Sequence, residues 1–158
     1  MQVKRATLLL LLKDDHILLA MKKRGFGANR WNGVGGKIDP GETVEAATIR
    51  ECQEEIGVTP EKLEKVAHFT FTFPDGTADM EVHAFTTRVW NGEPVETEEM
   101  APQWFKLSEI PYDNMWQDDI HWMPRVLAGE KLVGVFAFDE KENLLNESIK
   151  LTTVETVP

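Results

Sequence analysis

Residues 36–58 read GKIDPGETVEAATIRECQEEIGV and contain three glutamates, Glu51, Glu54 and Glu55, at helical spacing. If this segment is a helix, all three carboxylates lie on one side of it. Like charges at such spacings destabilise a helix by about 0.2–0.5 kcal/mol per pair. Such a stripe of like charge on one side of a helix therefore needs an explanation.

The same stretch carries the signals of a helix at about residues 43–56. Thr43 is a suitable N-cap and Gly57 a suitable C-terminal stop. An apolar stripe that can face a core is formed by Ile49, Cys52 and Ile56. The acidic stripe lies beside this core face, so its carboxylates are predicted to line the edge of a groove and to point toward the preceding glycine-rich loop.

Two interpretations of the acidic stripe follow from the spacing alone. It is either a solvated helix face, which is common, or a set of oxygen ligands. Oxygen ligands without His or Cys favour a hard cation such as Mg²⁺, with Mn²⁺ as a possible substitute. A bound cation would turn the repulsion into coordination, and Arg50 could hold a carboxylate in the required rotamer.

Composition limits the class of protein. The 158 residues are expected to form a single domain, 1–158, and 42% of them are apolar. No apolar run is long enough for a bilayer span, a signal peptide is not expected, and the single cysteine fits a reducing cytoplasm. The net charge is −10, with +6 in residues 1–37 and −16 in residues 38–158. We therefore predict a monomeric, cytoplasmic protein that binds neither long nucleic acid nor membranes; a small polyphosphate ligand remains possible through metal ions.

The remaining pattern predicts strands mixed with two helices. Strands are expected at 7–13 and 17–22, in a hairpin at 68–90 around PDGT, and at 103–111, 132–139 and 144–154. Residues 24–42 are expected to be mostly loop, and a second helix is predicted at 114–128, where Pro124 kinks it or marks its first turn. This order indicates an α/β sandwich with helices on both faces of a central sheet.

A resemblance rests on fixed residues in the opening stretch. Gly36, Glu42 and RECQEEIGV at 50–58 stand at the spacing of the Nudix box, and the chain resembles that family throughout the motif. Cys52 stands where the motif usually has an aliphatic residue, and it is still small and apolar. The resemblance implies a Nudix α/β/α sandwich with a central mixed β-sheet and Mg²⁺-dependent hydrolysis of a nucleoside diphosphate linked to another group.

The resemblance also implies a catalytic set and a metal site. The catalytic residues carried over are Arg50, Glu51, Glu54 and Glu55, and the motif leaves open which glutamate is the base. The metal ligands carried over are Gly36, through its backbone carbonyl, with Glu51, Glu54, Glu55 and Glu99. The four histidines, His16, His68, His83 and His121, show no metal-ligand spacing and receive no role.

Further segments resemble the animal members of the family that hydrolyse oxidised purine nucleoside triphosphates. They are MKKRGFGANRWNGVGGK, FTFTFPDGTADMEVHAF, ETEEMAPQWFKLSEIP and NMWQDDIHWMP. The chain departs from that branch at Val34, Gln117 and His68. The substrate-binding residues implied are Thr7, Lys22, Phe26, Asn32, Gly35, Gly36, Phe71, Phe73, Met80, Trp116, Asp118 and Asp119.

The residue types suit a purine pocket. Two adjacent carboxylates in an apolar pocket cannot easily both be ionised, so Asp118 and Asp119 could offer one donor and one acceptor to a base edge. By resemblance Trp116 stacks on the base, and both 8-oxoguanine and 2-hydroxyadenine are accepted. Taken singly, the two aspartates could instead be an acidic helix N-terminus, Trp116 a core residue and Asn32 a turn residue.

The function expected is hydrolysis of oxidised purine nucleoside triphosphates, 8-oxo-dGTP and 2-hydroxy-dATP, to monophosphate and pyrophosphate, which sanitises the nucleotide pool. One alternative is a Nudix enzyme for other small nucleotides, such as O6-methyl-dGTP or ordinary dNTPs. Another is a nucleotide-binding Nudix module without catalysis, against which the intact box argues.

Overall fold

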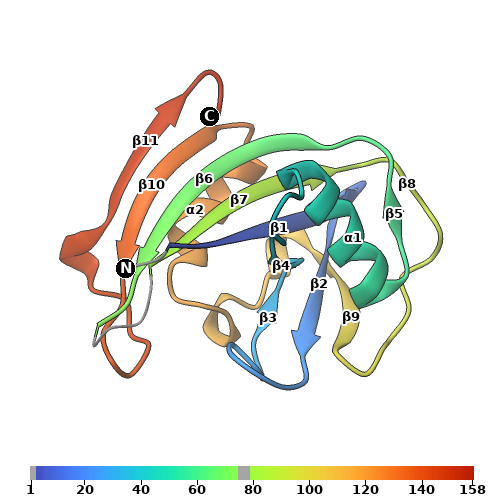
Figure 1. Ribbon diagram of the computed structural model, residues 1–158, viewed down its shortest axis with the longest axis horizontal. Coiled ribbons are helices and arrows are strands. Elements are labelled where there is room, and N and C mark those ends of the chain that lie inside the picture. The colour runs from blue at the N-terminus through green and yellow to red at the C-terminus, as the bar shows by residue number, and fades with distance from the viewer. Residues whose placement is uncertain (1–2, 75–78) are drawn as a thin grey trace.

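The computed structural model describes residues 3–74 and 79–158. Over these residues nine strands form one mixed sheet, with helix α1 (Val44–Ile56) in front of it and helix α2 (Asp119–Leu127) behind it in Figure 1. The strands of the sheet are β1 (Lys4–Lys13), β2 (His16–Lys22), β3 (Trp31–Asn32), β4 (Val34–Lys37), β6 (Glu64–Thr72), β7 (Met80–Thr87), β9 (Met100–Lys106), β10 (Lys131–Ala137) and β11 (Lys150–Val154). The predicted α/β sandwich is confirmed.

The central path of the sheet runs β11-β10-β6-β7-β1-β2-β3, with β4 paired to β1 and β9 paired to β2. The pairs β1–β7 and β6–β10 are parallel, whereas β1–β2, β6–β7 and β10–β11 are antiparallel. Strands β5 (Thr59–Pro60) and β8 (Trp90–Asn91) form a separate small pair. No helix in the described ranges is long and apolar enough to cross a membrane.

Strand β1 separates two hydrophobic cores because its side chains alternate between the faces of the sheet. Leu9 and Leu11 pack in one core with Cys52 and Ile56 of α1. Leu10 and Leu12 pack in the other core, together with the α2 residues Trp122, Met123 and Val126. The two helices therefore cover opposite faces, as predicted.

Helix α1 has the ends expected from the sequence. The Thr43 side chain accepts a hydrogen bond from the Ala46 amide, and Gly57 ends the helix in the left-handed conformation with φ 73°. The buried side of the helix differs from the predicted stripe, because Glu55 is buried beside Cys52 and Ile56 whereas Ile49 is only half-buried.

The expectation that residues 24–42 are mostly loop is confirmed, although they also hold the short strands β3 and β4. Two other expectations need correction. The second helix begins at Asp119 rather than near 114, because residues 112–114 form a separate 3₁₀ turn, and Pro124 lies inside α2 rather than in its first turn. The hairpin β6–β7 is confirmed, but the turn predicted at PDGT lies, from Asp75 onward, outside the described residues. The last predicted strand is shorter, because Asn146–Ser148 forms a 3₁₀ turn before β11.

Candidate active site

A cavity of about 280 Å³ lies between the sheet and the start of α2. Its walls come from β1, β4, β6 and β7, from the loop before β3, and from residues 116–122. All the predicted substrate-binding residues line it: Thr7, Lys22, Phe26, Asn32, Gly35, Gly36, Phe71, Phe73, Met80, Trp116, Asp118 and Asp119. The fold thus gathers at one place residues that are more than a hundred positions apart in the chain.

The two aspartates form a buried polar pair in this largely apolar cavity. Asp118 and Asp119 are each 3% exposed. Asp118 accepts a hydrogen bond of 2.9 Å from the indole Nε1 of Trp122, whereas Asp119 Oδ2 has no hydrogen-bond partner among the described residues. Burial raises the pKa of Asp118 to about 6, and burial together with the charge of Asp118 raises the pKa of Asp119 well above its usual value. Burial therefore favours the protonated form of these carboxyls, most strongly that of Asp119.

Aromatic side chains make the opposite wall. The Trp116 ring lies 5.2 Å from the ring of Phe26 and 5.5 Å from that of Phe138, and the Arg30 guanidinium sits 4.1 Å over its face. Trp116 is half-buried at the cavity rather than part of the closed core. Sequence reasoning missed Phe138 and Trp122 as lining residues. The closeness of Trp122 to Asp118, one helical turn away, was a signal for the latter.

The polar residues predicted around the base have different partners. The Thr7 hydroxyl hydrogen-bonds to Thr48 of α1, so its side chain is turned away from the α2 core. Asn32 Oδ1 accepts from the Gly33 amide at 2.8 Å, as a turn residue would. Lys22 Nζ donates to the carbonyl of Phe26 at 2.7 Å, which ties the loop to β2 at the cavity mouth.

On the α1 side, Arg50 organises the carboxylates of the box. Its guanidinium makes a bidentate pair with Glu42 at 2.7 and 2.9 Å and donates to Glu51 at 2.8 Å. It also reaches Glu54 at 3.2 Å and the Lys37 carbonyl at 3.0 Å. Arg50 therefore holds Glu51 in a defined rotamer and links α1 to the end of β4.

Glu55 and Glu51 face strand β4 at its two glycines. Glu55 is 8% exposed and accepts a hydrogen bond of 2.7 Å from the Gly35 amide. Burial raises the pKa of Glu55 to about 8 and also raises the pKa of Glu51. A Cβ on Gly36 would lie 2.5 Å from the Glu51 carboxylate, so only glycine lets β4 approach so closely.

These features fit a divalent cation, although the predicted ligands do not all converge. Neighbouring carboxylates beside a backbone strand that has no side chain in the way are a suitable oxygen donor set. Glu54 is 59% exposed at the outer side of this group. Glu99 forms an ion pair of 2.7 Å with Arg24, and its charge contributes to the raised pKa of Glu55.

The histidines show no metal-ligand spacing in the sequence, but the fold brings two of them together. His68 and His83 meet Glu81 on the sheet, with one donor atom from each residue within 4.8 Å of the others. Sequence spacing missed this cluster because it depends on the register between β6 and β7. His16 and His121 lie elsewhere, at the start of β2 and in α2.

Comparison with known proteins shows which family the chain belongs to. A family model described as NUDIX domain matches residues 2–126. The chain is 45% identical over 144 residues to the oxidized purine nucleoside triphosphate hydrolase of Mus musculus. The aligned residues cover 91% of this chain and 92% of the mouse protein. It is 44% identical to the protein of the same name from Danio rerio over 96% of both chains.

A solved structure is also similar. The MutT protein from Bacillus halodurans superposes with a TM-score of 0.84 at 26% identity, covering 94% of this chain and 97% of that one.

Proposed function

The chain belongs to the NUDIX domain family, and from this premise we propose that it hydrolyses oxidised purine nucleoside triphosphates to the monophosphate and pyrophosphate. Nudix hydrolases use divalent metal ions and act on small nucleotides. The mouse and zebrafish relatives, which carry this activity in their names, match the chain almost from end to end. The buried Asp118–Asp119 pair in the cavity is the observation that carries the choice of substrate.

The aspartate pair can discriminate between purine edges. An oxidised purine changes the pattern of donors and acceptors on its ring, and a site with fixed polar groups rejects a base that leaves them unpaired. Asp119, whose Oδ2 lacks a partner within the described residues, would donate its proton, and Asp118 would accept. If the proton moves between the two carboxyls, the same pair suits both 8-oxoguanine and 2-hydroxyadenine.

The aromatic wall would orient the base. Trp116, supported by Phe26 and Phe138, offers a flat face on which a purine can stack. Asn32 and Lys22 would bind the rim of the nucleotide, and the triphosphate would extend past Gly35 and Gly36 toward α1.

We propose that Glu51, Glu54, Glu55, Glu99 and the Gly36 carbonyl hold Mg²⁺, with Mn²⁺ as a substitute. Glu54 and Glu99 would join the other ligands by turning from their ion pairs with Arg50 and Arg24. Such an ion lowers the pKa of a bound water and screens the negative charge of the polyphosphate. Arg50 keeps Glu51 oriented, and the Gly35 amide keeps Glu55 aimed across β4. A carboxylate held in this way can take the proton of the attacking water. The water oxygen then bonds to the α-phosphorus while the bond from that phosphorus to the pyrophosphate oxygen breaks, which gives the monophosphate and pyrophosphate.

The test is kcat/KM for 8-oxo-dGTP and 2-hydroxy-dATP beside dGTP, each with Mg²⁺ and with EDTA. We expect turnover that needs Mg²⁺ and favours the oxidised nucleotides. Glu55→Gln should abolish turnover while nucleotide binding remains. Asp119→Ala should lose the preference between bases, whereas the exposed control Asp113→Ala should keep it.

Each part of the proposal can fail separately. Mg²⁺-dependent turnover without preference for oxidised bases would leave the glutamate chemistry and reject the aspartate pocket. No turnover of any of the three nucleotides would reject the proposed function. The expectations of a single domain over 1–158 and of a monomeric, cytoplasmic protein stay predictions.

A further inference from the structure

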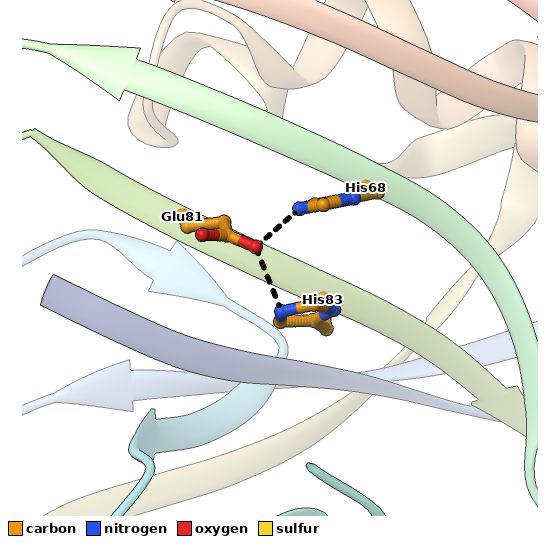
Figure 2. A group of neighbouring side chains, drawn as sticks. All are labelled: His68, Glu81 and His83. Atoms are coloured by element: carbon orange, nitrogen blue, oxygen red, sulfur yellow. Dashed lines mark hydrogen bonds and ion pairs between the residues drawn. The ribbon is translucent and has the colours of Figure 1, made fainter. Parts of the chain in front are cut away.

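A cluster of three metal-binding side chains lies on the sheet outside the candidate active site. His68 of β6 stands directly opposite His83 of β7 in the antiparallel register, and Glu81 is two residues before His83 on the same strand. Figure 2 shows both imidazole rings directed toward the Glu81 carboxylate. The three side chains share a face because strand residues alternate with a period of two.

The cluster is separate from the nucleotide cavity. Phe69, Met80 and Val82, the immediate neighbours of these residues in β6 and β7, line that cavity. His68, Glu81 and His83 therefore project from the opposite face, on the side of α1, and are not among the residues that line the cavity.

The His83 ring in this cluster has nitrogen atoms without hydrogen-bond partners among the described residues. His68 Nε2 lies 2.8 Å from Glu81 Oε1, and His83 Nε2 lies 3.4 Å from the same oxygen. His83 is 5% exposed, and neither of its ring nitrogens has a hydrogen-bond partner among the residues that the structure describes. Buried polar atoms without partners are rare and need an explanation. A ligand that accepts the imidazole lone pair would provide one.

We propose that His68, Glu81 and His83 bind a divalent transition-metal ion, Zn²⁺ by the chemistry of the ligands, with water completing the shell. Two imidazole nitrogens and one carboxylate oxygen suit zinc, whereas magnesium prefers oxygen ligands alone. Tetrahedral zinc with bonds of about 2.0–2.2 Å requires ligand atoms about 3.3–3.5 Å apart. The distances of 2.8 and 3.4 Å from Glu81 Oε1 to the two histidine nitrogens are near this range. The two imidazole rings are stacked with their centroids 4.5 Å apart, so they must turn toward each other for both lone pairs to meet one ion.

Exposure and charge are compatible with such a site. The side chains of His68 and Glu81 are 23% and 29% exposed, which leaves access for the ion and for water. Burial lowers the pKa of His83 to about 4, so this ring is neutral at pH 7. Lys65 and Arg5 are near enough to act on His83 and oppose a cation, while the negative charge of Glu81 favours one. These cations limit the affinity.

The ion would join β6 to β7 at the position where their other faces carry the walls of the cavity. Bound zinc stabilises the folded state, because the unfolded chain does not hold the three ligands together. The melting temperature should therefore report binding independently of catalysis.

The test uses the full chain with saturating Mg²⁺, which occupies oxygen sites and leaves histidine sites free. Zn²⁺ is titrated by calorimetry, and Co²⁺ is used as a spectroscopic probe whose visible absorption reports tetrahedral nitrogen and oxygen ligands. We expect one Zn²⁺ per chain, a higher melting temperature with Zn²⁺, and at least a tenfold loss of affinity in His68→Gln. His121→Gln, an exposed histidine in α2, and Glu55→Gln should both bind as the wild type does.

Two results would overturn the proposal. One is a wild-type protein that takes up no Zn²⁺ when Mg²⁺ is present. The other is a variant, His68→Gln or Glu81→Gln, whose Zn²⁺ affinity stays within twofold of the wild type. Both positions are only half-buried, so at least one of these variants should fold, and His83 is left unchanged because it is buried.

Discussion

Replacing Gly36 by alanine should displace the Glu51 carboxylate and lower activity while the fold stays nearly as stable as in the wild type. A Cβ at this position would lie 2.5 Å from both Cδ and Oε2 of Glu51, whereas ordinary contacts begin at about 3.4 Å. The obstacle is the end of a flexible side chain, so β4 can stay in place while the Glu51 carboxylate moves by about 0.9 Å. This movement also disturbs the hydrogen bond of 2.8 Å from Arg50.

The size of the effect follows from that displacement. A misplacement of about 1 Å in a reacting group can cost about 100-fold in rate, which corresponds to about 2.7 kcal/mol of transition-state stabilisation. The loss of stability should be within about 1 kcal/mol, since the Arg50–Glu51 pair is partly exposed. We therefore expect kcat of Gly36→Ala to fall about 100-fold, with KM and the urea unfolding midpoint nearly unchanged. Steady-state kinetics with Mg²⁺ and urea unfolding measure both.

Gly41→Ala is the matched control. Gly41 has φ 82° and no heavy atom within 4 Å of an added Cβ, so alanine there strains the backbone by about 1 kcal/mol without touching Glu51. It should lower stability and leave kcat intact. Wild-type kcat in Gly36→Ala would refute the inference that the close approach of β4 positions Glu51. The opposite contrast is Gly35→Ala, whose Cβ would collide with the Thr7 carbonyl of β1 and should damage the fold itself.

Three further outcomes follow from the buried polar groups. The folded-state pKa values of the Asp118–Asp119 pair are raised from an unfolded value of about 3.9, so the stability they contribute is present below about pH 4 and is lost as pH rises through about 6 and above. The free energy of unfolding should thus decrease between pH 5 and pH 8 by up to about 1.4 kcal/mol per pH unit for each proton, and Asp119→Asn should flatten this decrease in urea titrations. Trp122→Phe removes the indole donor to Asp118 and should cost about 2 kcal/mol by urea unfolding. Arg50→Lys loses the two-pronged pair with Glu42 and should lower kcat about tenfold, with KM unchanged.

These outcomes have their own controls. Trp104→Phe, at a partly buried position packed against the core beside α1, measures the effect of a smaller ring without a buried aspartate partner. If the free energy of unfolding of Asp119→Asn falls with pH as steeply as that of the wild type, the inference that the aspartate pair binds a proton in the folded state is wrong. A rise in KM with constant kcat in Arg50→Lys would mean that Arg50 binds substrate instead of orienting Glu51.

The parts of the fold that the sequence predicted are those set by local chemistry. Helix α1 is delimited by the Thr43 cap and the Gly57 stop, and both work within one turn of the chain. The start of α2 was misjudged because the apolar spacing already begins at Met115, although the residues between the 3₁₀ turn at 112–114 and Asp119 are not helical. Strands β3 and β4 were missed because such short, glycine-rich strands form only by pairing with β2 and β1.

In the candidate site, too, the sequence predicted which residues are involved but not the contacts that depend on long-range packing. The resemblance named residues that do line one cavity, yet it gave no information on Asp119 Oδ2 or on the hydrogen bond from Trp122 to Asp118, because these depend on how α2 packs. The meeting of His68 with His83 depends on the pairing of two strands and on a register shift between Lys65 and Ala67. Long-range register of this kind is set by the whole sheet and leaves little signal in a single segment.

The alternation along β1 has a consequence for how this enzyme family can change over time. Leu9 and Leu11 support the helix that carries the glutamates, and Leu10 and Leu12 support the helix that follows the aspartates. If the proposed site is correct, substitutions in the core on the α2 side would change base recognition and leave the packing behind the glutamates intact. Strand β1 would then let base preference and hydrolysis vary independently of each other.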